Sequence, residues 1–421
     1  MISPLAIFRV SCGHPQLSRL AYEAVNATTL RLLFIFMLCG GFFLAPAEMK
    51  AQTWNWTAES VDYGSKFTAL AVDKEGNVHL AYYGGENSEL KYAFRSHGSG
   101  RWFNLSLDKQ LGIFAVNIAL DPAGNPHVCY TPGALKYASW DGKQWQKQEI
   151  DAGHGTVEYN CSVTFSSEGI PHLTWYQTRG PGGASFLHLK YAVKKDGVWY
   201  AKTADYDREC GKWNSLVIDS QGLPHVAYSV FPPGDLKFAS YDGKDWHISV
   251  VDRARGGPAQ ASTGMGISLN FDPENRFVMS FYEAPINADS TGPGEGMLKL
   301  ARLIDGKWKI EPVAPVLKTV GWVEFTSDLL FDKKGRPHIR YEDGGAVKHA
   351  YWDGTKWHIQ VVVQPGSETF LYSSMKIAAD DTLYISYRDP ADGSLKVAVG
   401  SPVPEAAPKV ADAKNVPQPQ Q

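Results

Sequence analysis

Short runs in which apolar and polar residues alternate, separated by Gly, Asp and Pro, fill this chain from about residue 54 to residue 400. One run reads Asp-x-x-Gly-x-Pro-His, then an apolar residue, any residue and an aromatic, as in DPAGNPHVCY at Asp121 and DSQGLPHVAY at Asp219. LKYA or a close variant follows it, and a third run often begins Asp-Gly-x-Trp. Alternation over short runs between turn residues predicts β-strands.

The aromatic that ends the first run occurs in seven copies of a repeat about 50 residues long: Tyr82, Tyr130, Trp175, Tyr228, Phe281, Tyr341 and Tyr387. Four strands per repeat predict one propeller blade each. The copies are followed by only six trailing Trp strands, and the seventh begins at Trp56, ahead of the first copy. We therefore predict an all-β, seven-bladed β-propeller of four-stranded antiparallel blades over residues 52–400, with the last blade closed by the N-terminal strand. An open solenoid, the alternative, would not need that displaced strand.

The first 47 residues differ from the repeats. Leu32–Pro46 is almost wholly apolar, follows Arg31 and ends in a small-x-small pattern, which is typical of an export signal. This run is shorter than the ~20 residues of a membrane-spanning helix, so we expect cleavage and no stable membrane insertion afterwards; a retained anchor is the alternative. The long stretch before it suggests a true start at Leu30. We expect an exported protein, whether secreted, periplasmic or on the cell surface.

Charge and composition exclude some classes of partner and cofactor. A formal net charge of −3 argues against a nucleic-acid partner. Residues 401–421 are rich in Pro, Ala and Lys and are expected to form a disordered tail. No metal-ligand spacing or cofactor motif is evident, so we expect no metal and no cofactor, and we expect a monomer.

Three cysteines lie beyond the leader: Cys129, Cys161 and Cys210. Either Cys161 and Cys210 form a disulfide or the thiols are free and buried; the sequence leaves both alternatives open.

Loop lengths suggest which face binds. Turns between the first and second strands, and between the third and fourth, keep nearly constant length, whereas the other connections vary. In a four-stranded meander the variable connections share one rim, and loops on a rigid scaffold commonly carry binding residues. The variation concentrates around residues 253–265, 283–296 and 315–322.

Histidines recur at the start of the second strand, at His79, His127, His172, His225 and His338. A position that recurs in most blades is more typical of the framework than of a site. We expect these side chains to bond near the turn Asp rather than to bind a metal.

The third-to-fourth-strand segments SWDGKQW at Ser139 and SYDGKDW at Ser240 resemble the Asp-box of BNR-repeat, sialidase-like propellers. The HVAY and LKYA arrangement is also similar to repeats of some secreted polysaccharide lyases. The resemblance implies a propeller over residues 54–400. Sialidases hold a substrate carboxylate with three arginines, one in a Phe/Tyr-Arg-Ile-Pro motif; residues 63–67 here read YGSKF, which argues against that activity. The lyases use a His–Tyr pair, which would correspond to His154 and Tyr159.

Two hypotheses follow. The first is a binding module that recognises a glycan or a protein partner through the variable face, since aromatic rings beside charged groups suit a sugar. Its candidate residues are Arg253, Arg255, Glu283, Trp322, Glu324, Trp213 and Arg388. The second is a glycoside hydrolase or polysaccharide lyase, with candidates Glu283, Glu342, Asp343, His154 and Tyr159.

Overall fold

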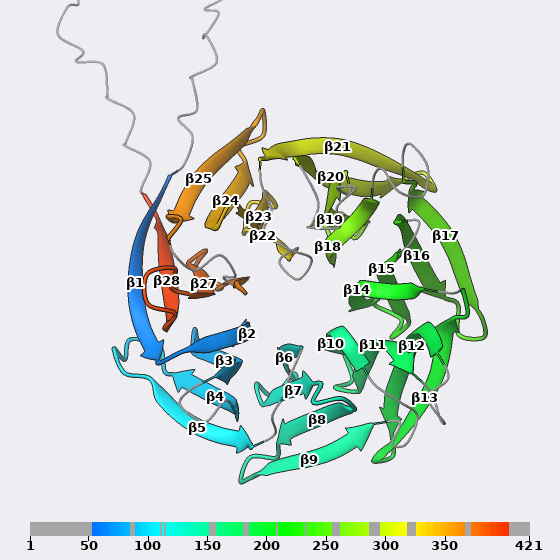
Figure 1. Ribbon diagram of the computed structural model, residues 1–421, viewed down its shortest axis with the longest axis horizontal. Coiled ribbons are helices and arrows are strands. Elements are labelled where there is room, and N and C mark those ends of the chain that lie inside the picture. The colour runs from blue at the N-terminus through cyan, green and yellow to red at the C-terminus, as the bar shows by residue number, and fades with distance from the viewer. Residues whose placement is uncertain are drawn as a thin grey trace, which may run out of the picture. The chain divides into compact units, whose positions relative to one another are not determined.

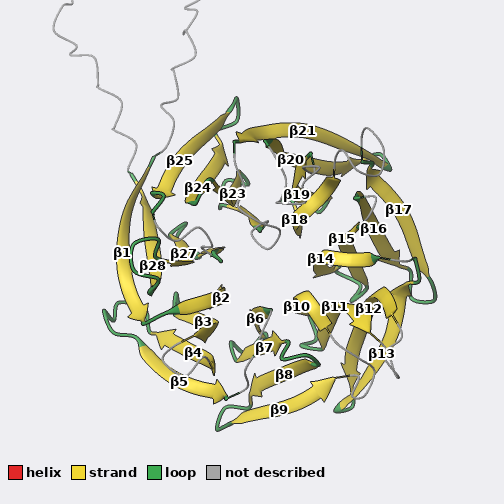
Figure 2. Cartoon of the chain, viewed as in Figure 1, coloured by secondary structure: helices red, strands yellow, loops and turns green. Residues whose placement is uncertain are grey.

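The computed structural model describes residues 53–84, 89–109, 112, 115–150, 157–179, 185–207, 209–231, 234–254, 262–285, 295–317, 326–366 and 372–403. These residues form strands, turns and loops, with no helix among them, and so no helix that could cross a membrane. The strands make seven four-stranded antiparallel sheets arranged as blades around a central channel (Figures 1 and 2). The predicted fold is confirmed. The leader lies outside the described residues, as does the tail beyond residue 403.

Each blade is named in chain order, and its strands a to d run from the channel outward. Blade 1 holds β2 (Ser65–Val72), β3 (Val78–Gly84), β4 (Glu89–Arg95) and β5 (Phe103–Asp108), and blade 2 holds β6 (Val116–Leu120), β7 (Pro126–Tyr130), β8 (Leu135–Trp140) and β9 (Trp145–Ile150). Blade 3 holds β10 (Val157–Phe165), β11 (Pro171–Arg179), β12 (Ser185–Lys195) and β13 (Val198–Asp205), and blade 4 holds β14 (Cys210–Ile218), β15 (Pro224–Val230), β16 (Asp235–Tyr241) and β17 (Trp246–Asp252). Blade 5 holds β18 (Ser262–Phe271), β19 (Phe277–Ala284), β20 (Gly296–Ile304) and β21 (Lys307–Val316), and blade 6 holds β22 (Ser327–Phe331), β23 (Pro337–Asp343), β24 (Ala346–Trp352) and β25 (Trp357–Val363). Blade 7 holds β26 (Ser374–Ile377), β27 (Leu383–Arg388), β28 (Leu395–Pro402) and β1 (Trp54–Asp62).

The ring closes through β1, which pairs antiparallel with β28 from Trp54 opposite Pro402 to Asp62 opposite Leu395. This is the offset first strand that the missing seventh Trp predicts. Strand β28 runs two residues past the expected end of the propeller, and the Val403 N–H donates to the Thr53 carbonyl (2.8 Å). Closure leaves blade 7 with a complete set of four strands, as in the other blades.

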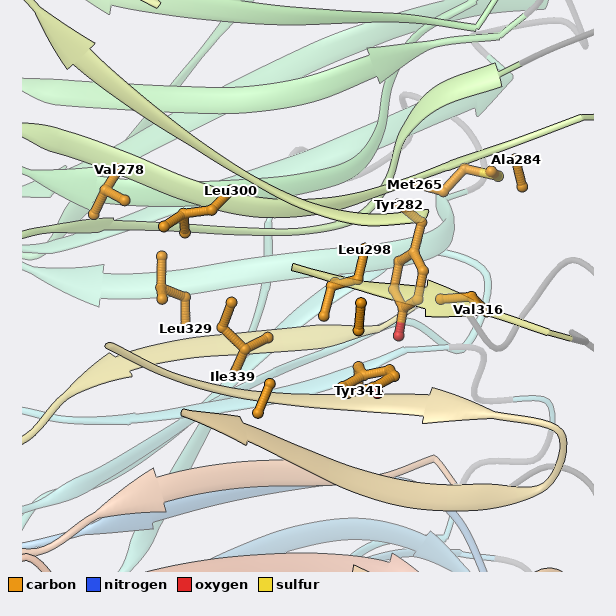
Figure 3. Packing of buried hydrophobic residues seen from close by; sticks show 12 residues of the cluster. Met265, Val278, Tyr282, Ala284, Leu298, Leu300, Val316, Leu329, Ile339 and Tyr341 are labelled. Atoms are coloured by element: carbon orange, nitrogen blue, oxygen red, sulfur yellow. The ribbon is translucent and has the colours of Figure 1, made fainter. Parts of the chain in front are cut away.

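Apolar side chains pack in the seams between adjacent blades. The seven repeat aromatics are all buried, at most 4% exposed. Figure 3 shows the seam between blades 5 and 6, where Tyr282 and Leu298 of blade 5 face Ile339 and Tyr341 of blade 6. Burial of this kind stabilises a propeller whose blades have no shared central core.

One repeat position carries a pair across every seam. The residue just before the repeat aromatic on strand b meets, in the next blade, the residue that lies five positions before the a–b turn. Hydrogen bonds join four of these pairs: Thr174 with Asn214 (2.8 Å), Ser280 with Ser327 (2.7 Å), Arg340 with Ser373 (3.1 Å) and Ser386 with Thr68 (2.7 Å). Two further pairs are apolar and share a core cluster: Ala81 with Val116, and Ala227 with Ile267.

The remaining seam, between blades 2 and 3, is covalent. Cys129 and Cys161 form a disulfide, and Cys210 is a buried free thiol. The Cys161–Cys210 bridge considered from the sequence is therefore wrong. Cys129 precedes the repeat aromatic, and Cys161 lies in strand a of the next blade, five residues before the a–b turn, so the two occupy the seam-pair positions, which Cys210 does not.

Reduction of this disulfide is expected to destabilise the propeller, because the bridge closes a loop with a sequence separation of 32 residues. Cys129→Ser should lower the free energy of unfolding by about 3–4 kcal/mol on the chain-entropy estimate. Denaturant unfolding with and without reductant measures this. A Cys210→Ser protein is the control and should remain sensitive to reductant, whereas insensitivity there would return the bridge to Cys210.

The repeated histidines bond within the framework, as expected. The Nδ1 atom of His79 lies 2.7 Å from the Tyr92 hydroxyl, and Nε2 lies 3.5 Å from the Asp73 carboxylate. Burial lowers the pKa of His79, and the nearby Asp73 carboxylate opposes that shift only in part. Among the described residues no cluster of His, Cys, Asp and Glu could hold a metal ion.

Carboxylates at the ends of several outer strands tie one blade to the next. Asp62 of blade 7 accepts from the Tyr82 hydroxyl (2.5 Å) and from Lys91, both in blade 1. Asp205 of blade 3 does the same for Tyr228 and Lys237 in blade 4. The recurring Asp after the Trp strand is therefore part of the framework.

Candidate functional site

The central channel holds a cavity of about 580 Å³ lined by the innermost strands of all seven blades. Strand a of each blade ends at the short turn before strand b, so its first residues lie toward the rim of the variable loops. Side chains on one blade cover edge groups on the next: the Leu329 N–H donates to Ser268 Oγ (3.0 Å) and the Met375 N–H to Asp328 Oδ2 (2.8 Å). Some backbone N–H groups that face the channel are thus hydrogen-bonded to side chains of the neighbouring blade. A ligand is therefore more readily placed at the mouth of the channel than along these strand edges.

Three aromatic residues stand at the same repeat position at this mouth. The turn position of a blade is the residue that begins its a–b turn, such as Asp73, Asp219 and Ala378 in blades 1, 4 and 7. Phe67, Trp213 and Tyr372 each lie six residues before it, and all three line the cavity. Each has a positive φ, between 46° and 51°. The ring centroids of Phe67 and Tyr372 are 4.7 Å apart.

A positive φ is unusual for a bulky residue and costs on the order of 1–2 kcal/mol. Blade 5 has Gly266 at the equivalent position, with a φ of 58°, which is the residue type this conformation favours. At Phe67 the β2–β3 register shifts, and the register of β14 shifts around Trp213. Bulges of this kind re-aim a side chain, and retained strain of this size clusters at functional sites.

Trp213 extends beyond its own blade. It packs against the core cluster between blades 4 and 5 and also against the cluster between blades 5 and 6. Its indole lies edge-on to Phe231, with ring centroids 6.5 Å apart. The ring therefore lies over blade 5, where Gly266 takes up little space.

A buried charged network borders the cavity at the seam between blades 6 and 7. Arg340, only 1% exposed, donates to Asp328 Oδ2 from Nε (2.9 Å) and Nη2 (2.5 Å), and from Nη1 to Thr326 and Ser373. Burial alone would lower the pKa of Arg340, but Asp328 and Glu342 outweigh burial and raise it. The guanidinium stays charged, and its donors are used within the protein.

The predicted catalytic carboxylates that the structure describes are engaged in ion pairs or hydrogen bonds. Glu342 accepts from the N–H (2.9 Å) and hydroxyl of Ser373. Glu283 pairs with Lys299, and Asp343 accepts from the Leu317 N–H (2.9 Å) and from Lys348 (2.7 Å). Strand β21 does not end in an Asp of the kind that pairs with the next blade elsewhere. In blade 6, Asp343 instead supplies the carboxylate to Lys348, the lysine of the LKYA-type run.

Of the predicted ligand residues, Trp213 lines the channel cavity. Arg253 is exposed just after β17, with Nη1 3.9 Å from the Asp235 carboxylate, and Arg388 ends β27. His154, Arg255, Trp322 and Glu324 lie outside the described residues, and Tyr159 is described only as part of β10. Trp213 thus lines the same cavity as Phe67 and Tyr372, two residues that the sequence did not single out.

Solved structures of two polysaccharide lyases are among those that share this fold. An ulvan lyase, described as a new family of polysaccharide lyase, is 14% identical with a TM-score of 0.53, over 82% of this chain and 95% of its own. The polysaccharide lyase Uly1 is 12% identical with a TM-score of 0.51, over 85% of this chain and 93% of its own. A lectin from Aleuria aurantia in complex with α-methyl-L-fucoside is 12% identical with a TM-score of 0.46, over 72% of this chain and 97% of its own.

No model of a known protein family matches this chain, and no curated protein sequence matches it. At these identities the two lyases show that the chain shares their propeller architecture. They do not show its activity, and the likeness to the lectin is too low to support an argument.

Proposed function

We propose that this protein is an exported propeller that binds a glycan at the variable-face mouth of its channel. The observation that carries the proposal is the trio of aromatic residues, Phe67, Trp213 and Tyr372, held at equivalent positions in a strained backbone conformation around one cavity. Sugar rings present C–H faces that stack on aromatic side chains, and their hydroxyls bond to polar groups nearby. Export is consistent with the Cys129–Cys161 disulfide, because disulfides persist in oxidising compartments.

Replacing Trp213 by Ala is expected to weaken glycan binding about tenfold, the loss of one well-placed stacking contact. A panel of purified polysaccharides, titrated by calorimetry against the protein, measures this. Phe67→Ala should act in the same direction. The matched control is Phe103→Ala, because Phe103 is exposed on an outer strand of blade 1, away from the channel cavity. Equal binding by the Trp213 and Phe103 variants would place the site elsewhere.

Folding can be separated from binding at the same position. Trp213→Gly should unfold at a higher temperature than Trp213→Ala, because Gly alone relieves the positive φ. Both variants should bind equally weakly. Loss of binding that follows the loss of stability would instead indicate a packing role for the ring.

A second candidate function is a carbohydrate-active enzyme, either a glycoside hydrolase or a polysaccharide lyase. Asp328 favours it, because this carboxylate lines the cavity, is 20% exposed and lies beside the buried Arg340. The same polysaccharide panel, assayed for new reducing ends and for the ultraviolet absorbance of unsaturated sugars, tests it. Turnover that Asp328→Asn abolishes while binding remains would establish the enzyme; binding without product would establish the binding module.

A further inference from the structure

A second cavity, of about 730 Å³, lies on the opposite rim, in the seam between blades 3 and 4. The short turns of these two blades build it, and its lining includes His172, Tyr191, Lys195, Tyr200, Lys202 and Tyr241. Tyr200 is 56% exposed, and Lys202 Nζ lies 3.7 Å from the centroid of the Tyr241 ring. The cavity is separate from the channel site and shares none of its lining residues.

Comparison of the repeats shows what is different here. In four blades Nε2 of the strand-b histidine faces the carboxylate of the turn Asp: His79–Asp73 (3.5 Å), His127–Asp121 (3.4 Å), His225–Asp219 (3.0 Å) and His338–Asp332 (3.5 Å). Blade 3 has Ser166 at the turn position, and its hydroxyl accepts only the short-turn N–H of Ile170 (3.2 Å). His172 is 4% exposed, and within the described residues its Nε2 has no hydrogen-bond partner. The Nε2 atoms of His79 and His338 also make no hydrogen bond, but each lies 3.5 Å from a carboxylate, which His172 lacks.

In the two remaining blades, 5 and 7, the histidine is replaced, and the turn Asp is either replaced or paired with another residue. Blade 7 has Ala378 at the turn position and Tyr384 in place of the histidine. Blade 5 has Val278 in place of the histidine, and the Asp272 carboxylate pairs with Arg276 instead (2.7 Å). Among the described turns, blade 3 is therefore the one that retains the histidine without the acid.

The chemistry of the unpaired atom follows from its surroundings. Burial lowers the pKa of His172 to about 4, with a further contribution from Lys195, so the ring is neutral near pH 7. Burial raises the pKa of Tyr191, whose hydroxyl lies 2.7 Å from Nδ1. The hydroxyl can donate to Nδ1, which leaves Nε2–H as a donor toward the place that the turn carboxylate fills in other blades.

We propose that this cavity binds a carboxylate-bearing sugar, with the carboxylate at His172 Nε2 and the sugar ring against the tyrosines. Lys195 and Lys202 supply positive charge, whereas Glu168 and Asp196, which line the same cavity, would orient the acid group away from themselves. The Nε2 atom exposes less than 1 Å², so binding includes a shift of side chains at the cavity floor.

Restoring the missing acid tests the proposal. In Ser166→Asp the new carboxylate should lie beside His172 Nε2, as the turn Asp lies beside the equivalent histidine in four other blades. It should then exclude the carboxylate of the ligand. The full chain is titrated with glucuronate, glucose and acetate while the imidazole signals are followed by NMR. We expect glucuronate to shift the His172 signals, and Ser166→Asp to weaken its affinity at least about tenfold, the loss of one hydrogen bond to a charged group. The variant should also melt at a higher temperature.

Ser220→Asp is the matched control, because it adds the same charge to the same cavity from the neighbouring turn. Ser220→Asp should lower the affinity for glucuronate much less than Ser166→Asp does. Trp213→Ala should leave the affinity for glucuronate unchanged. Glucuronate binding that survives Ser166→Asp overturns the site at His172. Equal binding of glucose overturns the role of the carboxylate, and equal binding of acetate overturns the role of the sugar.

Discussion

A chain that lacks Thr53–Asp62 is expected not to form a stable propeller. Strand β1 is the outer strand of blade 7, and it also contacts blades 6 and 1. The buried Trp54 lies edge-on to Tyr351 and His349 of blade 6, with ring centroids 4.7 and 5.1 Å away. At its other end Asp62 accepts from Tyr82 of blade 1. The deletion removes contacts at both seams. We expect it to remove most of the free energy of unfolding, which is roughly 5–15 kcal/mol for such domains.

Thermal unfolding and gel filtration of the deleted protein measure the effect. A graded variant, Trp54→Ala, should cost about 3–5 kcal/mol, since its indole is almost fully buried. Thr57→Ala on the same strand is exposed and serves as the control, with little change expected. A deleted protein that elutes and melts like the parent would show that the ring does not need its N-terminal strand.

The repeat predicted the blades and the closure because it fixes spacing along the chain, and strands with constant spacing form equivalent blades. The seam pairs were harder to see. The position before the repeat aromatic holds Ala81, Cys129 and Arg340 in different blades, so its chemistry varies while its geometry does not. Which residue faces it across the seam depends on how adjacent blades meet, and neither periodicity nor spacing carries that information. The pairing of Cys129 with Cys161 was therefore missed.

The channel site was predicted only in part. Loop lengths predicted that the variable rim binds, and Trp213, singled out as an aromatic outside the repeat, lines the cavity there. Phe67 and Tyr372 were not, because backbone φ is not visible in a sequence. One signal was available: with the repeats aligned on their turn, Gly266 stands where Trp213 stands, and a Gly at an otherwise variable strand position suggests a positive φ.

Removal of the Arg340 guanidinium is expected to be the costliest single change near the channel. In Arg340→Met the Asp328 carboxylate loses two charge-assisted hydrogen bonds, and Glu342, 6% exposed, loses the cation 3.7 Å away. Breaking a buried ion pair from one side costs about 3–5 kcal/mol, because the remaining charge is left uncompensated. Denaturant unfolding measures this, and Arg253→Ala, which removes an exposed arginine, should change stability little.

The neighbouring seam suggests how to separate charge from packing. There the same pair is neutral, Ser280 with Ser327, and strand a carries Ser268 at the position that Asp328 holds in blade 6. Arg340→Ser combined with Asp328→Ser and Glu342→Gln should therefore be more stable than Arg340→Ser alone, even though it changes more residues. If the triple variant is the less stable of the two, the network stabilises the seam by its attraction and hydrogen bonds, and uncompensated charge is not the reason for the loss.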